Sequence, residues 1–173
     1  RPDCLAYHGR QHWAIEALLG SPEFSNLQWT SLQPNIFSQL VMSPAAEFIK
    51  KYRETGKQDI LRLVLSEDSP VGIIDPEEIG VVAAHLLTQG DTSVHNKAKY
   101  ILNGPEDITG KQIVDMIERY IGAAVKDVIY KDMFFVDMLY EAKYAATKES
   151  KNVIHSIVHA SETAWEGKCS TST

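Results

Sequence analysis

The hydrophobic and polar positions of this 173-residue chain follow helical spacing in some segments and form short apolar runs in others. Apolar residues that recur every three or four positions predict amphipathic helices. In residues 8–19, for example, Trp13, Ala14, Ala17 and Leu18 share one face. The same criterion, together with start and stop signals, predicts further helices at residues 44–52, 76–87, 110–121, after Asp132, and at 149–165.

Two of these helices begin with strong capping signals. Asp75 can accept the unpaired N–H groups of a first turn, and Pro76 then stands where a missing N–H costs no hydrogen bond. Thr109 and Gln112 have the spacing of a capping box, and Gly122 has the position of a left-handed C-cap. The helix after Asp75 has an apolar stripe, which predicts that it is buried: Ile79, Val82, Ala83, Leu86 and Leu87.

Apolar runs of strand length separate the predicted helices. They lie at residues 26–34, 60–65, 100–102 and 125–131. Strands that alternate with helices favour an α/β architecture with a mainly parallel sheet. We therefore predict one α/β domain over residues 1–173.

Composition and charge narrow the class of protein. The net charge is -6 and the sequence has no block of Lys and Arg, so we expect no nucleic-acid partner. The long uncharged stretch at residues 25–46 contains Ser, Gln, Asn and two prolines, so we expect no membrane span. The two cysteines, Cys4 and Cys169, fit free thiols in a reducing cytoplasm better than a disulfide between the ends of the chain.

Motifs for redox and metal chemistry are absent or weak. The ten glycines build neither G-x-G-x-x-G nor a phosphate loop. His8 with His12, and His155 with His159, have helical i, i+4 spacing, but no third metal ligand is evident, so we predict no metal site. A Y-x-x-x-K pattern ends at Lys148, too late in the chain for a short-chain dehydrogenase, and is read as a surface helix.

The segment "QPNIF" at residues 33–37 is a better candidate for a site. A strand that ends at Pro34 and continues into Asn35 lies where an open α/β sheet forms its ligand crevice, outside the carboxyl ends of the strands. The Asn35 amide could donate a hydrogen bond to a carbonyl or carboxamide. The alternative is a simple turn built from Pro and Asn.

Several segments together resemble the NmrA-like family, which consists of atypical, extended members of the short-chain dehydrogenase/reductase superfamily. They are "WAIEALL" followed by "LQWTSLQPNIF", then "GIIDPEEIGVVAAHLL", and "YILNGPEDITGKQIVDMIERYIG". The resemblance covers nearly the whole chain and implies the carboxyl-terminal half of such a protein. That half would contain the last part of a Rossmann-like parallel sheet and a small α/β lobe that covers the substrate. The amino-terminal half, with its G-x-x-G-x-x-G turn, would be absent.

The resemblance also implies site residues. His12 occupies the position of a family lysine and becomes the candidate catalytic proton donor, whereas Gln33 replaces a family arginine. Pro34, Asn35 and Phe37 match the loop that faces the nicotinamide of NADP or NAD. Gln33 and Gln39 are the candidate substrate contacts.

Three functions follow from these expectations. Loss of the family lysine and arginine favours a redox-sensing or regulatory module that binds NAD(P), above all NADP(H), and acts on a protein partner. The first alternative is an NAD(P)H-dependent oxidoreductase of a small carbonyl or quinone compound. The second is a non-redox isomerase or cyclase on the same fold. Since an incomplete sheet has an open edge, we also expect the chain to form a homo-oligomer or to pair with an amino-terminal half.

Overall fold

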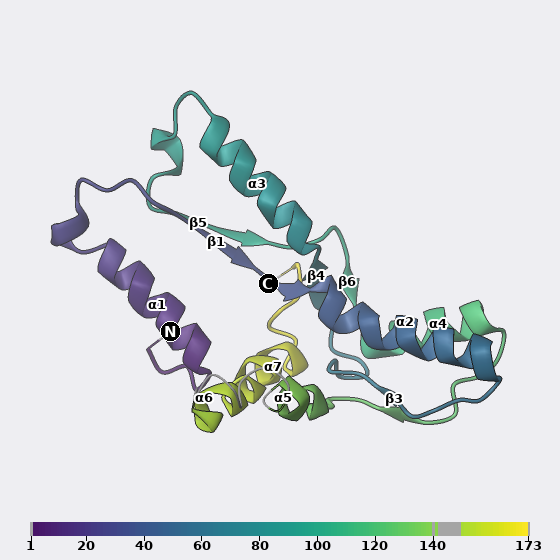
Figure 1. Ribbon diagram of the computed structural model, residues 1–173. Helices are drawn as coiled ribbons and strands as arrows, with labels where there is room; N and C mark the ends of the chain where they lie inside the picture. The colour runs from purple at the N-terminus through teal and green to yellow at the C-terminus, as the bar shows by residue number, and fades with distance from the viewer. Residues whose placement is uncertain (1, 140, 142–149, 173) are drawn as a thin grey trace.

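A computed structural model describes residues 2–139, 141 and 150–172 of the chain (Figure 1). It confirms the α/β class, with parallel pairing in three of the four strand pairs among these residues. The helices are α1 Tyr7–Leu19, α2 Ser38–Thr55, α3 Pro76–Thr88, α4 Gly110–Ile121, α5 Phe134–Leu139, α6 Lys151–His155 and α7 Val158–Trp165. The strands are β1 Thr30–Pro34, β2 Ile36–Phe37, β3 Leu61–Arg62, β4 Val71–Ile74, β5 Ala98–Leu102, β6 Asp107–Ile108 and β7 Val128–Ile129.

The first part of the fold is a parallel pair of strands between two helices. β1 pairs with β5 from Thr30 opposite Ala98 to Pro34 opposite Leu102. Helices α1 and α3 lie on opposite sides of this pair (Figure 1). Among the described strands, β1 has no other neighbour, so its second edge is open.

The prediction that α3 is buried was wrong. Its cap is confirmed, because the Asp75 carboxylate accepts a hydrogen bond from the Glu77 N–H at 3.0 Å. However, no residue of α3 is buried, and Leu87 at the end of the predicted stripe is 83% exposed. The helix packs against β1, and a two-stranded sheet is too narrow to cover the whole stripe.

The second part of the fold is a lobe with the main core. Helices α2 and α4 pack against each other and over the parallel pair β3–β7, as the lower right of Figure 1 shows. The core consists of Val41, Ala45, Phe48, Leu61, Leu63, Leu65, Val71, Ile113, Val114, Ile117 and Ala164. The predicted capping box at Thr109 and Gln112 and the left-handed Gly122 that ends α4 are both confirmed.

Helix α2 begins six residues before the predicted start, at Ser38, with Pro44 inside it. The predicted strand at residues 60–65 is reduced to the two residues of β3, although the backbone of Leu63 and Leu65 still bonds to Ile129 and Lys131. Short strands β2, β4 and β6 form a mixed sheet that the sequence did not predict, with β2 parallel and β6 antiparallel to β4.

The end of the chain returns to the first residues of strands β4 and β6. The predicted helix at 149–165 is interrupted between α6 and α7, and residue 149 lies outside the described part of the chain. After α7, the carbonyl of Cys169 accepts a hydrogen bond from the Gly72 N–H at 2.7 Å. The carboxylate of Asp107 accepts one from the Ser170 hydroxyl at 2.5 Å. Cys4 and Cys169 are both free thiols, as predicted. None of the described helices combines the length and apolar character that crossing a bilayer requires.

Candidate functional site

The predicted loop lies at the carboxyl end of β1. Its residues differ in whether their side chains bond within the chain or are exposed. The Asn35 amide donates to the side-chain oxygen of Asn103 at 2.7 Å and to the carbonyl of Cys169 at 2.8 Å, while its own oxygen accepts from the Ile36 N–H. Asn35 thus joins the ends of β1 and β5 to the end of the chain. Phe37, by contrast, leaves nearly half of its surface exposed. Of the two, Phe37 has the surface available to a ligand.

Gln33 belongs to a polar cluster between α1 and the strand pair. The Glu16 carboxylate accepts hydrogen bonds from Gln33 Nε2 at 2.8 Å, Ser31 Oγ at 2.5 Å and Lys99 Nζ at 2.6 Å. We call Glu16, Ser31, Gln33 and Lys99 the Glu16 cluster. It joins α1 to β1 and β5, and the Gln33 amide is occupied by its hydrogen bond to Glu16.

The Glu16 cluster holds its carboxylate ionised. Burial of Glu16 raises the pKa of the carboxyl group, but hydrogen bonds from Lys99, Ser31 and Gln33 and the charge of Lys99 lower it by more. The resulting pKa of Glu16 is about 2, compared with an ordinary value of 4.5. A carboxyl group with this pKa cannot donate a proton near neutral pH, so Glu16 acts as a structural anchor.

His12 lies one turn before Glu16 on α1, with its side chain exposed. Its ring forms no hydrogen bond or ion pair with the rest of the described chain. In the second predicted pair, the two histidines have separate carboxylate partners, Asp137 for His155 and Glu162 for His159. Across the described residues, no group of three or more potential ligands could hold a metal ion. The Y-x-x-x-K pattern, from Tyr144 to Lys148, lies outside the described residues.

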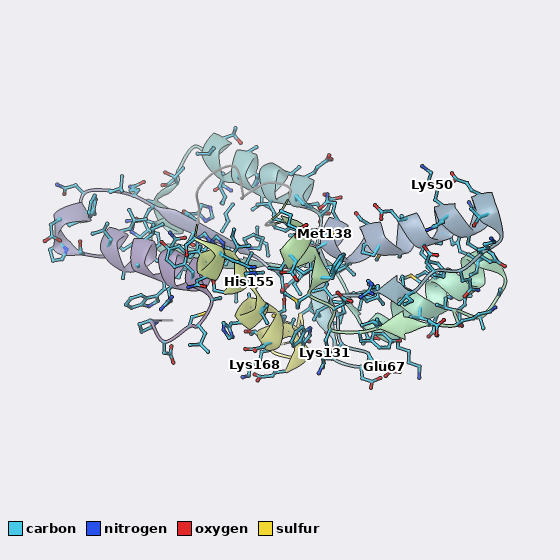
Figure 2. All side chains as sticks on the ribbon, turned by 60° about the horizontal axis from the view of Figure 1, so that its bottom comes forward. Lys50, Glu67, Lys131, Met138, His155 and Lys168 are labelled. Atoms are coloured by element: carbon cyan, nitrogen blue, oxygen red, sulfur yellow. The ribbon has the colours of Figure 1, made fainter. Side chains whose placement is uncertain are left out.

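Gln39 lines a largely apolar cavity in the described part of the chain. This cavity, called the lobe cavity here, has a volume of about 520 Å³ and lies between α2, the β3 segment and α5. Its apolar walls include Leu40, Phe48, Ile60, Phe134, Phe135 and Met138. Figure 2 shows Met138 on α5 close to the start of α2. A volume of a few hundred Å³ with apolar walls is typical of small-molecule sites.

Charged residues around the lobe cavity are arranged in pairs. Arg62 Nη1 lies 2.6 Å from Asp132 Oδ2, and the Arg62 guanidinium lies 5.6 Å from the centre of the Phe134 ring. Lys51 forms an ion pair with Asp59. Glu47 is the remaining charged residue among the described lining. The cavity therefore combines an exposed aromatic and aliphatic wall with a rim in which both cations are already paired.

The sequence predicted Gln39, which lines this cavity, as a substrate contact, but it predicted none of the residues that form the far wall. Asp132 was predicted to cap the next helix, and it does, because its carboxylate accepts from the Phe134 N–H at 2.7 Å. The same carboxylate also pairs with Arg62, a partner 70 positions away along the chain. A usable signal was the cluster of Phe134, Phe135 and Met138, which is too apolar for an exposed turn.

The described residues fit a nucleotide cofactor only as one wall of its site. The exposed Phe37 ring could contact a nicotinamide. However, the space beside Gly104 is taken by the Ile73 carbonyl, and the space beside Gly72 by Asn103 and Thr171. Neither glycine therefore leaves the open backbone that a pyrophosphate requires.

Comparison with known proteins gives one informative similarity. No protein-family model matches the chain. The chain is 28% identical over 102 residues to the (4-alkanoyl-5-oxo-2,5-dihydrofuran-3-yl)methyl phosphate reductase of Streptomyces griseus subsp. griseus. This match covers 59% of the chain and 32% of that reductase, so the chain corresponds to about a third of the length of the curated relative. The chain is thus similar to part of a reductase and has an α/β fold with parallel strands.

Proposed function

We propose that this chain is the carboxyl-terminal portion of an NADP(H)-dependent oxidoreductase that reduces a small carbonyl or quinone compound in the lobe cavity. The observation that carries the proposal is the cavity itself, which has the size and apolar walls of a substrate site. Similarity to a reductase supports a reduction over other reactions of the same fold. The choice of NADP(H) follows from the resemblance to NmrA-like proteins.

The position of the lobe cavity supports this assignment. Phe37 ends β2, and α2 follows directly, so that Gln39 and Leu40 in its first turn line the cavity. A nicotinamide against the exposed Phe37 would therefore lie beside the cavity that holds the carbonyl. Open α/β sheets bind ligands at this place, outside the carboxyl ends of parallel strands. Within this arrangement, the chain supplies a cofactor wall and the substrate pocket, and the pyrophosphate site belongs to another part of the protein.

The test is NADPH-dependent reduction by the protein as its own cells make it. Quinones and aromatic ketones are supplied as substrates, and loss of NADPH absorbance is recorded. Phe134→Ala removes part of the cavity wall and should raise KM about tenfold, a factor that corresponds to about 1.4 kcal/mol. The matched control is Tyr120→Ala, an exposed aromatic residue on α4 outside the lobe cavity, which should leave KM unchanged. Equal KM values for both variants, or no NADPH consumption with any carbonyl, would contradict the proposal.

A second candidate is the redox-sensing module, which binds NADP(H) and reports to a protein partner without turnover. It is favoured by the position of His12, which is exposed and does not line the lobe cavity. The described lining contains neither His nor Tyr, the residues that most often donate a proton to a carbonyl. Turnover by the unsubstituted protein separates the two candidates, and His12→Ala then tests whether His12 takes part in it. Loss of turnover would place His12 in an oxidoreductase, whereas NADPH binding that persists without any turnover would favour the sensor.

A further inference from the structure

The charges around the lobe cavity indicate which class of compound it accepts. This inference rests on the proposed function and concerns the substrate of the same site. The Streptomyces griseus relative is named as the reductase of a phosphate ester. Arg and Lys are the side chains that most often bind a phosphate group, provided that their charge is available to it.

Neither cation of the described lining is available. Arg62 Nη1 lies 2.6 Å from Asp132 Oδ2, and the Asp132 side chain is only 9% exposed. Lys51 is paired with Asp59 at the rim. With Glu47 included, two cations face three carboxylates, so an anionic ligand would meet a net negative charge. A phosphate that used Arg62 or Lys51 would have to compete with the carboxylate that each of them already pairs with.

The remaining surface suits an uncharged ligand. Phe134 and Met138 each leave about half of their surface exposed beside the cavity, with 53% and 51% accessible. The Leu40 carbonyl is an additional acceptor. Pro44, four residues later in α2, lacks the N–H that would otherwise bond to it. Both Leu40 and Pro44 line the cavity. The wall is therefore mainly apolar and aromatic.

We propose that the lobe cavity binds an uncharged compound with an aromatic or alkyl body and excludes phosphate esters. The Arg62–Asp132 pair is the specificity-determining element, because Asp132 neutralises the cation that a phosphate would otherwise use. The cavity thus differs in ligand class from the site that the name of the relative implies.

Binding is followed by NMR of the four methionine methyl groups, labelled with carbon-13, during titration of the chain. Met138 lines the lobe cavity and is assigned by Met138→Leu, while Met116 lines a separate cavity between β6 and α4 and serves as an internal control. The two ligands share a naphthalene body: acetonaphthone is uncharged and naphthyl phosphate is anionic. We expect acetonaphthone to shift the Met138 signal with a Kd about tenfold or more below that of naphthyl phosphate.

Asp132→Asn tests whether the Asp132 carboxylate excludes phosphate esters by neutralising Arg62. Asparagine can keep the cap on α5, because its side-chain oxygen can accept from the Phe134 N–H, but it releases the charge of Arg62. Binding of naphthyl phosphate should then strengthen about tenfold, with acetonaphthone nearly unchanged. Asp127→Asn makes the same change outside the cavity lining and should alter neither Kd.

Two results would overturn the inference. Naphthyl phosphate that binds as tightly as acetonaphthone would show that the cavity accepts anions. A Met138 signal that neither ligand shifts, in a folded sample, would show that the cavity is not a ligand site. Because this readout requires no turnover, failure of the reductase assay leaves it intact. Conversely, a reductase that prefers phosphate esters would retain the proposed function and overturn only the substrate class.

Discussion

Glu16→Gln removes the charge at the centre of the Glu16 cluster while keeping the size of the side chain. Glutamine can still accept hydrogen bonds from Ser31 and Gln33 through its amide oxygen. It cannot form the ion pair with Lys99, which joins α1 to β5. The substitution therefore isolates the contribution of the charge to the docking of α1.

The size of the effect follows from the pKa of Glu16. A decrease from 4.5 to about 2 corresponds to about 3 kcal/mol of preference for the ionised form in the folded chain. The Glu16 side chain is 13% exposed but Lys99 is 47% exposed, so solvent screens part of this energy. We expect the free energy of unfolding at neutral pH to fall by about 2 kcal/mol in Glu16→Gln.

The effect should depend on pH in a defined direction. A carboxyl group whose pKa is lowered by folding stabilises the folded state above its ordinary pKa of 4.5. This stabilisation is lost as the pH falls from 4.5 toward 2. The difference between the original protein and Glu16→Gln should therefore be full at neutral pH and shrink steadily over that interval.

Urea unfolding at a series of pH values measures this difference. The control is Glu54→Gln, because Glu54 is exposed on α2 and forms no ion pair with a described residue. It should change the unfolding free energy by less than about 0.5 kcal/mol. A deficit in Glu16→Gln that stays constant from neutral to acid pH would refute the electrostatic reasoning, as would a variant as stable as the original.

Two further predictions concern α4. Ile113 has no exposed surface at the centre of the lobe core, so Ile113→Ala should lower the unfolding free energy by about 2–5 kcal/mol, and Ile113→Val by only about 1 kcal/mol. Equal losses in the two variants in urea unfolding would argue against a tightly packed core. Thr109→Ala removes the hydroxyl that caps α4 and should cost about 1 kcal/mol, whereas Thr109→Ser should restore most of it, as thermal unfolding would measure. A serine variant no more stable than the alanine variant would exclude the cap as the cause.

The sequence predicted those features that depend only on residues close together along the chain. The capping box of α4, the Asp75 cap and Gly122 depend on residues a few positions apart, and all three are confirmed. The start of α2 was missed because Pro44 is a strong signal for the first turn. In the structure, the helix accepts Pro44 in its interior and begins at Ser38.

The features that could not be predicted from the sequence depend largely on contacts between residues far apart along the chain. The Asn35 amide was predicted to face a ligand, and its bonds to Asn103 and Cys169 join three segments that nothing in the sequence brings together. The same holds for Arg62 and Asp132 in the lobe cavity. Strands β2, β4 and β6 are two to four residues long, so they are too short to show a period. The roles of His12, Pro34, Phe37 and Gln39 toward a cofactor or substrate stay predictions.

The distribution of buried residues bears on the proposed function through the two-stranded β1–β5 sheet. The lobe has a closed core, whereas neither α1 nor α3 contains a buried residue. Large apolar side chains lie exposed on these helices and on β5, including Ile15, Leu18, Val81, Leu87 and Ile101. In an α/β sheet, each helix covers more than one strand, so a sheet that ends at the open edge of β1 leaves such side chains uncovered. Under the proposal, one physical cause would account for both the exposed helices and the open strand edge. Both are what the proposal of a carboxyl-terminal portion requires, because further parallel strands beside β1 would bury these residues and bring a pyrophosphate site to the carboxyl end of the sheet.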